Sequence, residues 1–441
     1  MTESRVPALE IAGLCAMAFA LRMLVAVLTP VPAEDAANYL WMAQRFAAGD
    51  WAAALSEVFP PGLPLLVAPV VAAGFDPFRG GQLVVASVAA LAIWPCVRLA
   101  ETREPSLARI TGVLLALLPL ATRFVGEVLT EPVFATFAAT ALLAALRGHH
   151  AWSGVAAALA FTLRPEALAL PAANLVLGRV RGLAAVLPLG AGVVGLAAWR
   201  SAHGQAFELL PKLGFNAARG DAALSADGIR WQTVLENLVA LPGAWLEAFW
   251  GVGLLALYGI WRLRGDRTGR AFVAVLAVVV MAVLAFLTRR RFLVAWFPVL
   301  ALFLPVALAA LRERSRYVLQ VLLVLTSLLG CLNFTDDDRY GERVVGEWLA
   351  TMLRPGETVA GDMTRVIWFA GLRPLSPRHF STEELREATR AAGVRFVVLG
   401  GRRAGNAELA ASLAPGFTPT GMPLRETRAA ERRGLLVLER R

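Results

Sequence analysis

Residues 271–311 read AFVAVLAVVVMAVLAFLT, then RRR, then FLVAWFPVLALFLPVALAAL. Each apolar run is long enough to cross a bilayer as a helix, because a span needs about 20 predominantly apolar residues. Similar runs recur through most of the 441-residue chain. The sequence therefore predicts a mainly α-helical membrane protein, a polytopic bundle of about eleven transmembrane spans followed by a C-terminal α/β domain.

The composition supports this fold class. Hydrophobic residues make up 57% of the chain and charged residues 17%, whereas soluble domains average about 45–50% and about 25%. Disorder, collagen and coiled coils are excluded, and three cysteines in apolar runs exclude a disulfide scaffold. A net charge of +10 would suit a nucleic-acid partner. However, the arginines alternate with apolar runs, so we expect membrane lipids and no nucleic acid as partners.

The limits of the expected spans follow from the apolar runs. They are 9–29, 81–99, 109–124, 130–147, 151–163, 166–178, 182–200, 244–262, 271–288, 292–311 and 315–332. The fifth and sixth runs are short for a bilayer of about 30 Å, so they form either two spans or one broken pair. The first run is too long for a signal peptide and carries Arg22.

Arginine positions predict the orientation. If the N-terminus lies inside, every inside loop carries arginine, as the positive-inside rule requires. An odd number of spans then places the C-terminus outside a cytoplasmic (inner) membrane. The large outside loops are 30–80 and 201–243. One outside segment, Arg289-Arg290-Arg291, breaks the rule.

Two segments outside the spans have predictable structure. In the first large loop, 35–48 predicts a helix on the membrane surface, with Tyr39, Met42 and Phe46 as its apolar face. Phe59-Pro60-Pro61-Gly62 separates it from a second short helix at 62–73. These elements belong to the expected transmembrane domain, residues 1–332.

Residues 333–441 are more charged and predict a separate extracytoplasmic α/β domain. Short apolar runs and helix signals alternate there. The expected helices are 341–353 and 382–392, and the expected strands are 358–361, 395–400 and 435–438.

The strongest chemical signal follows the first span directly. Glu34 and Asp35 form a carboxylate pair, and Tyr39 comes one helical turn later. Paired carboxylates at a membrane surface suit general-base catalysis. Alternatively, the pair only caps the helix that follows, where negative charge is favourable.

A set of short motifs extends this signal along the chain. They are Asp35, Tyr39, Ala43 and Gly49; Phe59-Pro60-Pro61-Gly62-Leu63-Pro64; Leu129-Thr130-Glu131-Pro132; Thr162-Leu163-Arg164-Pro165-Glu166; and Arg291-Phe292-Leu293 before Trp296-Phe297-Pro298. In order and sidedness they resemble the GT-C superfamily of membrane glycosyltransferases. The resemblance is greatest to the branch with protein O-mannosyltransferases, the lipid A aminoarabinose transferase and Rgt-type transferases. It covers most of residues 10–311.

This resemblance implies a function. A polyprenyl-phosphate sugar would donate a hexosyl or pentosyl unit to a lipid, glycan or protein acceptor, with inversion. Asp35 would take the proton from the acceptor hydroxyl. Many members have Asp-Glu where this chain has Glu34-Asp35 and then Ala36, which leaves the role of Glu34 unassigned.

The remaining site candidates are carboxylates and cations predicted on the outer side. Glu34 and Glu131 are the other catalytic candidates; Tyr39, Arg164, Glu166, Lys212, Arg289, Arg290 and Arg291 are the substrate-binding candidates. Arginine suits a leaving phosphate because its planar fork matches phosphate oxygens. The sequence has no dinucleotide-binding or P-loop signature, which agrees with a lipid-linked donor. A metal is neither predicted nor excluded, so a divalent cation stays open as a cofactor.

Simpler roles compete with these assignments. Glu131 with Pro132 suits a helix N-terminus, and Arg164 can pair with Glu166. The arginine triplet can anchor anionic headgroups, worth about 1 kcal/mol per residue. Arg22 either reaches the surface or pairs with a carboxylate such as Glu131.

Asp336-Asp337-Asp338 can cap a helix or bind a cation. For the whole protein, the alternatives to a glycosyltransferase are a transporter or lipid flippase with an outside accessory domain, and a non-catalytic membrane scaffold.

Overall fold

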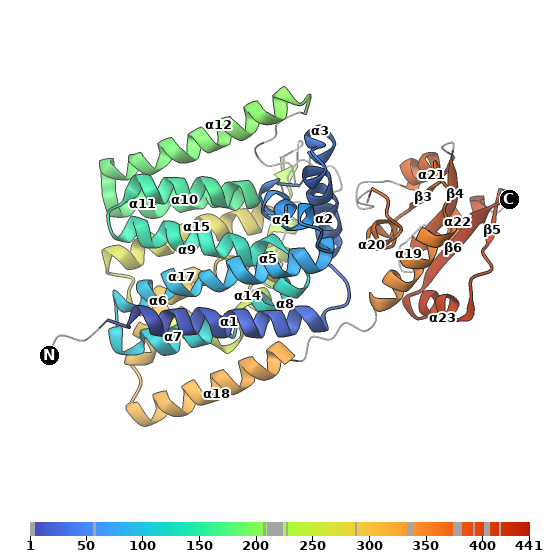
Figure 1. Ribbon diagram of the computed structural model, residues 1–441. Helices are drawn as coiled ribbons and strands as arrows, with labels where there is room; N and C mark the ends of the chain where they lie inside the picture. Colours follow the sequence, from blue (N-terminus) through green and yellow to red (C-terminus); the bar gives the residue numbers. More distant parts are fainter. Residues whose placement is uncertain are drawn as a thin grey trace.

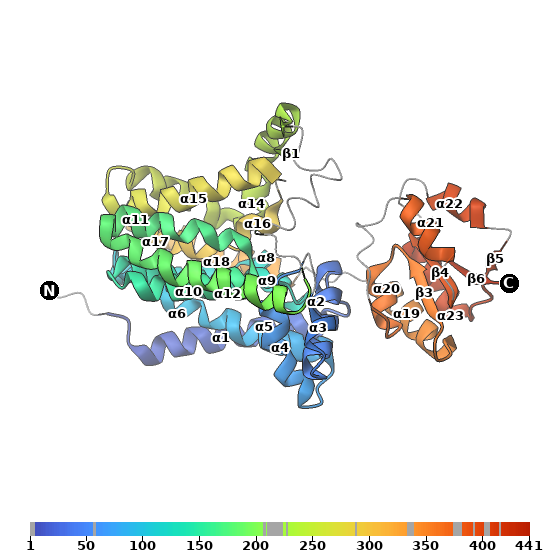
Figure 2. The ribbon, with the colours of Figure 1, turned by 90° about the horizontal axis from the view of Figure 1, so that it is seen from above.

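The computed structural model describes residues 5–55, 59–205, 209, 224–225, 228–286, 289–332, 339–373, 382–390, 393–400, 406–413 and 416–441. A bundle of helices forms the larger part, and a smaller α/β unit lies at one end of it (Figure 1). The turned view in Figure 2 shows the same arrangement.

The bundle is built from helices of very different lengths. Its first half contains α1 (Ala8–Leu28), α2 (Glu34–Ala47), α3 (Trp51–Ala54), α4 (Gly62–Ala72), α5 (Pro77–Leu91), α6 (Ile93–Glu101), η1 (Pro105–Leu107), α7 (Ala108–Ala116), α8 (Pro119–Gly126), α9 (Thr130–Leu146), α10 (His150–Leu163), η2 (Pro165–Ala169), α11 (Leu170–Gly178), η3 (Arg179–Ala185) and α12 (Val186–Ala202). Its second half contains β1 (Leu224–Ser225), β2 (Gly228–Ile229), α14 (Trp231–Arg262), α15 (Arg267–Phe286), α16 (Arg290–Val294), α17 (Phe297–Ala309) and α18 (Glu313–Leu332).

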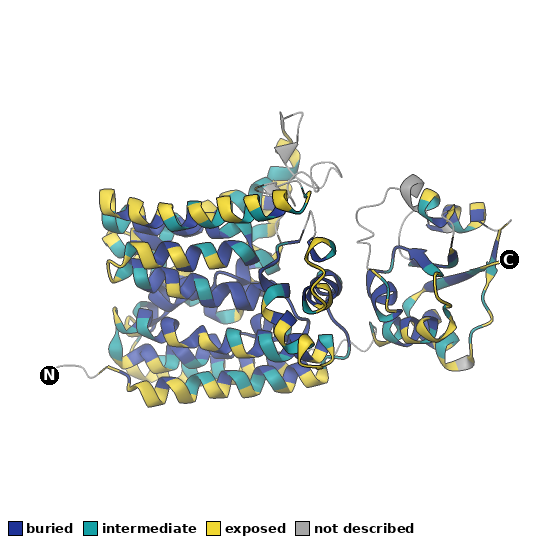
Figure 3. Ribbon diagram, turned by 45° about the horizontal axis from the view of Figure 1, so that its top comes forward, coloured by how far each residue is buried: buried dark blue, intermediate teal, exposed yellow. Residues whose placement is uncertain are grey.

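Burial divides these helices into central and peripheral ones. Helices α9 and α17 are buried almost all round, whereas α12 and α18 expose many large apolar side chains. Figure 3 shows this arrangement, with buried residues inside the bundle and exposed residues along its outer faces. Exposed apolar faces of this extent suit contact with lipid rather than water. The protein is a multi-pass membrane protein.

The number of spans differs from the expected eleven. Among the described residues, six helices are long and apolar enough to cross a membrane: Ala8–Leu28, Pro77–Glu101, Pro165–Ala202, Trp231–Arg262, Arg267–Ala285 and Glu313–Leu332. The pair α7 and α8 is bent by 45°, and counting it as one span gives seven. Helices α4, α9, α10 and α17 are apolar but shorter. Eleven full-length spans are therefore not confirmed.

The stretch Pro165–Ala202 folds back on itself. A Cβ at Gly182 would lie 2.1 Å from the carbonyl oxygen of Asn174. In one continuous helix these residues would be about 12 Å apart along the axis. Helices α11 and α12 are therefore separate and joined by η3, as Figure 1 shows.

One predicted segment is more helical than expected. The run expected to start at residue 244 belongs to α14, which begins at Trp231, so the last part of the segment 201–243 is helix. The helix contains Pro242 and is kinked at Trp250, which has a positive φ of 55°. The sequence reading missed the first part of α14 because its polar residues interrupt the apolar pattern.

The short helices predicted after the first span are present. Helix α2 spans Glu34–Ala47, and Tyr39, Met42 and Phe46 on it are buried. Helix α4 spans Gly62–Ala72 and packs against α2. Their packing places the N-terminus of α2 at the end of the bundle that faces the α/β unit (Figure 1).

The α/β unit contains a four-stranded sheet in the order β3-β4-β6-β5. Strands β3 and β4 are parallel, and β6 runs antiparallel to both β4 and β5. Its elements are α19 (Tyr340–Met352), β3 (Thr358–Gly361), α20 (Thr364–Phe369), α21 (Thr382–Arg390), β4 (Val394–Gly400), α22 (Asn406–Leu413), β5 (Phe417–Pro419), α23 (Leu424–Arg433) and β6 (Leu435–Arg440). The three expected strands and two expected helices are confirmed; α20, α22, α23 and β5 were not predicted.

A buried ion triad joins three elements of this unit. Glu342 accepts hydrogen bonds from Arg365 at 2.6 and 2.8 Å and from Arg433 at 2.6 Å. Burial alone would raise the pKa of Glu342, but the two guanidinium groups lower it below its ordinary value. The triad fixes Arg365 on the side of the unit that faces the bundle.

Polar contacts hold the unit against the bundle. Arg339 pairs with Glu127 at 3.3 Å, and Arg343 donates to the carbonyl oxygen of Pro30 at 3.3 Å. The guanidinium of Arg373 lies 5.0 Å from the ring centre of Trp41. These contacts bring the α/β unit over the N-terminus of α2.

Candidate active site

The two carboxylates predicted as a catalytic pair begin helix α2. Glu34 and Asp35 are its first two residues, and Ala33, which precedes them, donates its backbone N–H to the carbonyl oxygen of Glu127 at 2.9 Å. Their charges suit the positive end of the helix dipole. Ala33 occupies the N-cap position, so neither carboxylate is the N-cap residue.

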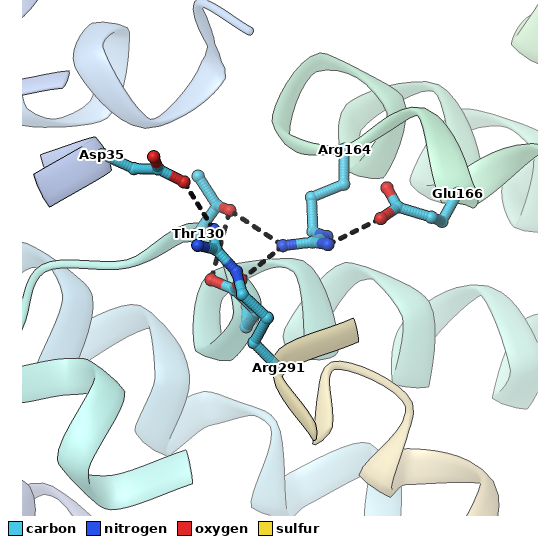
Figure 4. Close-up of polar contacts among 6 residues, drawn as sticks. Asp35, Thr130, Arg164, Glu166 and Arg291 are labelled. Carbon is cyan, nitrogen blue, oxygen red and sulfur yellow. Dashed lines mark hydrogen bonds and ion pairs between the residues drawn. The ribbon is translucent and has the colours of Figure 1, made fainter. Parts of the chain in front are cut away.

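A chain of ion pairs extends from Asp35 into the bundle (Figure 4). Asp35 accepts a hydrogen bond from Arg291 at 2.7 Å, and Arg291 also donates to Glu131 at 2.9 Å. Glu131 pairs with Arg164 at 2.7 Å, which in turn pairs with Glu166 at 2.6 Å. Five residues predicted from the sequence therefore form one connected cluster.

Glu131 is the centre of this cluster. Its side chain is 0% exposed, and its Oε1 atom accepts from both Arg164 and Arg291. Two cations around one buried carboxylate provide the compensation that a buried charge needs. Arg164 pairs with Glu166, the simpler role considered for it from the sequence, and it binds Glu131 as well.

The side chains come from segments far apart in the sequence. Glu131 lies in the first turn of α9, Arg164 lies in extended backbone between α10 and η2, and Arg291 lies on the short helix α16. The turn before α9 contains Val128 with a φ of +58°. A β-branched residue rarely adopts this conformation, so the surrounding packing holds the turn that joins Glu127 to the start of α9.

The charge states follow from these contacts. Burial alone would lower the pKa of Arg291, but the charges of Glu131 and Asp35 raise it above its ordinary value. Arg291 is therefore a permanent cation. Tyr39 lies one turn after Asp35 and is 2% exposed, with its ring edge against Phe59. Burial, followed by the charges of Asp35 and Glu131, raises the pKa of Tyr39, so its hydroxyl stays neutral.

The outer side of the cluster opens into a pocket of about 560 Å³. Its acidic residues are Glu34, Asp35, Glu127 and Glu247, and its basic residues are Arg289, Arg290, Arg291, Arg339 and Arg365. Arg339 and Arg365 come from the α/β unit. Sequence reasoning missed them because no local pattern shows which surface of that unit meets the bundle. It also missed Glu127 and Glu247, which lie at the end of α8 and on α14 in the bundle.

The arginine triplet divides into different roles. Arg291 points inward to Asp35 and Glu131, whereas Arg290 pairs with Glu247 at 3.0 Å on the exposed side. All three line the pocket. Arg291 and Arg290 therefore differ in their ion pairs and in how far they are exposed.

Other predicted candidates lie elsewhere. Lys212 and Asp336-Asp337-Asp338 lie outside the described residues. Arg22 is fully buried, and its Nε and Nη1 atoms have no hydrogen-bond partner. Glu131, which the sequence left open as a partner of Arg22, forms ion pairs with Arg164 and Arg291.

A divalent cation, which the sequence left open as a cofactor, would need a cluster of ligating side chains. Within the described part of the chain, no group of three or more His, Cys, Asp or Glu side chains could hold a metal ion.

Comparisons with known proteins identify the architecture. No family model matches the chain, and no curated protein matches it in sequence. Among solved structures, the fold is similar to ArnT from Cupriavidus metallidurans bound to undecaprenyl phosphate, with a TM-score of 0.63 and 14% identity, over 97% of both chains.

A second similar structure is the archaeal oligosaccharyltransferase AglB from Archaeoglobus fulgidus, in complex with an inhibitory peptide and a dolichol-phosphate. Its TM-score is 0.58 and its identity 12%, over 93% of this chain and 73% of that one. Both are GT-C superfamily glycosyltransferases. The chain therefore has the GT-C fold.

Proposed function

We propose that the protein is a glycosyltransferase of the cytoplasmic membrane, which transfers a sugar from a polyprenyl-phosphate donor to an acceptor on the outer side. The observation that carries the proposal is the ion pair between Asp35 and Arg291 in the wall of the charged pocket. It combines a base with a phosphate-binding cation at the end of a membrane bundle. Undecaprenyl phosphate in ArnT and dolichol-phosphate in AglB support this class of donor.

The proposed reaction requires two groups that this site contains. Asp35 takes the proton as the acceptor oxygen forms a bond to the anomeric carbon. The bond from that carbon to the phosphate oxygen breaks, and its electron pair leaves with the polyprenyl phosphate. Attack from the face opposite the phosphate inverts the anomeric centre.

Arg291 would connect donor binding with activation of the base. Its guanidinium binds Asp35. A donor phosphate would compete for that guanidinium and free the Asp35 carboxylate to accept a proton. Glu131 would hold Arg291 in position during this exchange through the bond to its Nε atom. The cation would then stabilise the charge that grows on the leaving phosphate.

Replacement of Arg291 with Ala tests the phosphate role. Loss of a charge-assisted contact should weaken binding of undecaprenyl phosphate by about tenfold or more. Binding of the purified protein in detergent can be measured by native mass spectrometry. Arg290→Ala is the matched control, because Arg290 is exposed and pairs with Glu247. Equal, small losses in both variants would leave only the headgroup-anchor role for the triplet.

The orientation has its own test. We propose that the N-terminus lies inside and the α/β unit outside, from the arginine content of the loops. A reporter that is active only outside the membrane should give a signal when fused after residue 441 and none when fused after residue 267. The reverse result would place the pocket on the cytoplasmic side and contradict an extracytoplasmic reaction.

A further inference from the structure

A second pocket lies where the α/β unit meets the bundle. It has a volume of about 360 Å³, within the range of small-ligand sites. Gln44 of α2 and Arg79 of α5 form part of one side, and Arg343 and Glu347 of α19 lie on the other. None of these residues lines the pocket at Asp35.

The charge of this second pocket is balanced. Its lining includes two carboxylates, Asp76 and Glu347, and two guanidinium groups, Arg79 and Arg343. Arg343 pairs with Glu347 at 2.7 Å. The formal sum is therefore zero, whereas the pocket at Asp35 has five arginines and four carboxylates. A balanced site gives a phosphate no excess positive charge to bind.

Both arginines are also committed to protein oxygens. Arg79 donates to Gln82 at 2.7 Å and to the carbonyl oxygen of Ala26 at 3.2 Å. Arg343 donates to the carbonyl oxygen of Pro30, in addition to its pair with Glu347. These bonds fix the two guanidinium groups in place. A ligand that hydrogen-bonds to them therefore costs less side-chain entropy on binding.

Aromatic rings complete the lining. Phe78, Trp368 and Phe369 contribute to it, and the rings of Trp368 and Phe369 lie 4.8 Å apart. Rings attract the C–H faces of a ligand, while carboxylates, amides and guanidinium groups hydrogen-bond to hydroxyls. A neutral ligand with C–H faces and many hydroxyls is a saccharide.

Helix α2 connects this pocket with the candidate base. Gln44 follows Asp35 by nine residues on the same helix, a distance of about 14 Å along its axis. We propose that the second pocket binds the saccharide of a glycan acceptor, whose terminal hydroxyl reaches Asp35. This inference rests on the proposed function and selects a glycan among its acceptor classes.

Calorimetric titration of the full-length protein in detergent tests the proposal. The probes are maltotriose, mannotriose and N-acetylchitotriose, with a Ser/Thr-rich hexapeptide as the competing class. Wild type should bind at least one trisaccharide. Gln44→Ala and Glu347→Ala should each weaken that binding by about tenfold, because each removes hydrogen-bonding groups from the pocket.

A matched control separates the pocket from general surface effects. Gln232 lies exposed on α14, where it bonds to Glu236, and it lines neither described pocket. Gln232→Ala should bind the trisaccharide as wild type does. Gln44 and Glu347 are exposed, so their variants should fold, which thermal unfolding checks. No trisaccharide binding, binding of the peptide alone, or unchanged binding in both pocket variants would overturn the proposal.

The Asp35→Asn variant keeps the two proposals distinguishable. It should bind the trisaccharide as wild type does, because Asp35 does not line the second pocket. If Asp35→Asn transfers sugar normally while the pocket variants lose trisaccharide binding, the catalytic proposal fails and the subsite stands. If Asp35→Asn is inactive while the pocket variants bind normally, the subsite fails and the catalytic proposal stands.

Discussion

Replacement of Asp35 with Asn is expected to slow sugar transfer by about 10²–10⁴-fold, the usual effect of removing a general base. Asn keeps the size of the side chain and a hydrogen-bonding oxygen but cannot take the proton. Donor binding should be retained, because the amide no longer competes for Arg291 as a counter-ion. Initial rates of transfer, together with the affinity for undecaprenyl phosphate, separate the loss of chemistry from a loss of binding.

Glu34→Gln is the matched control for this prediction. Glu34 neighbours Asp35 at the start of α2 and lines the same pocket, so its loss should have a milder effect. An inactive Glu34→Gln with an active Asp35→Asn would make Glu34 the base. If both variants stay active, Glu131 becomes the next candidate.

Replacement of Glu131 with Ala is expected to destabilise the protein strongly. The change leaves the buried guanidinium of Arg164 and the partly buried guanidinium of Arg291 without their shared carboxylate. Breaking a buried ion pair typically costs about 3–5 kcal/mol. Thermal unfolding in detergent should show a clear drop in Tm, and donor binding should weaken because Arg291 loses its support.

Glu247→Ala provides the comparison for Glu131. Glu247 pairs with the neighbouring arginine, Arg290, but its side chain is 59% exposed. An exposed pair contributes about 0–1 kcal/mol, so this variant should unfold close to the wild-type temperature. Equal Tm values for the two variants would show that Glu131 does not hold the cluster together.

The motifs that resemble the GT-C superfamily, together with their predicted side of the membrane, pointed to four residues of this cluster. Asp35, Glu131, Arg164 and Arg291 each follow or precede an apolar run at the same predicted side of the membrane. Helices that cross a bilayer bring such ends together even when the residues are 160 positions apart, as Glu131 and Arg291 are. The sequence could therefore group these residues, although their roles remain proposals.

Partners and helix ends were harder to predict. The sequence named no partner for Glu131 beyond the open alternative of Arg22, and the packing of α9 against α16 and the end of α10 brings Arg291 and Arg164 to it. Arg339 and Arg365 reach the pocket through the docking of the α/β unit, which depends on surface complementarity rather than on periodicity. The count of eleven spans stays unconfirmed, because α4, α9, α10 and α17 are apolar but shorter than a full span, and apolar runs alone do not show which of them cross the membrane.

The central claim is that this pocket transfers sugar from a polyprenyl-phosphate carrier. Its most direct test is to incubate the purified wild-type protein with undecaprenyl-phosphate-linked hexoses and pentoses and a candidate glycan acceptor, and to follow the lipid by mass spectrometry. The account predicts that one donor is consumed, that free undecaprenyl phosphate accumulates, and that Asp35→Asn prevents this release. Intact donors throughout, with the sugar-lipid instead moving between the leaflets of reconstituted vesicles, would contradict it and favour a flippase.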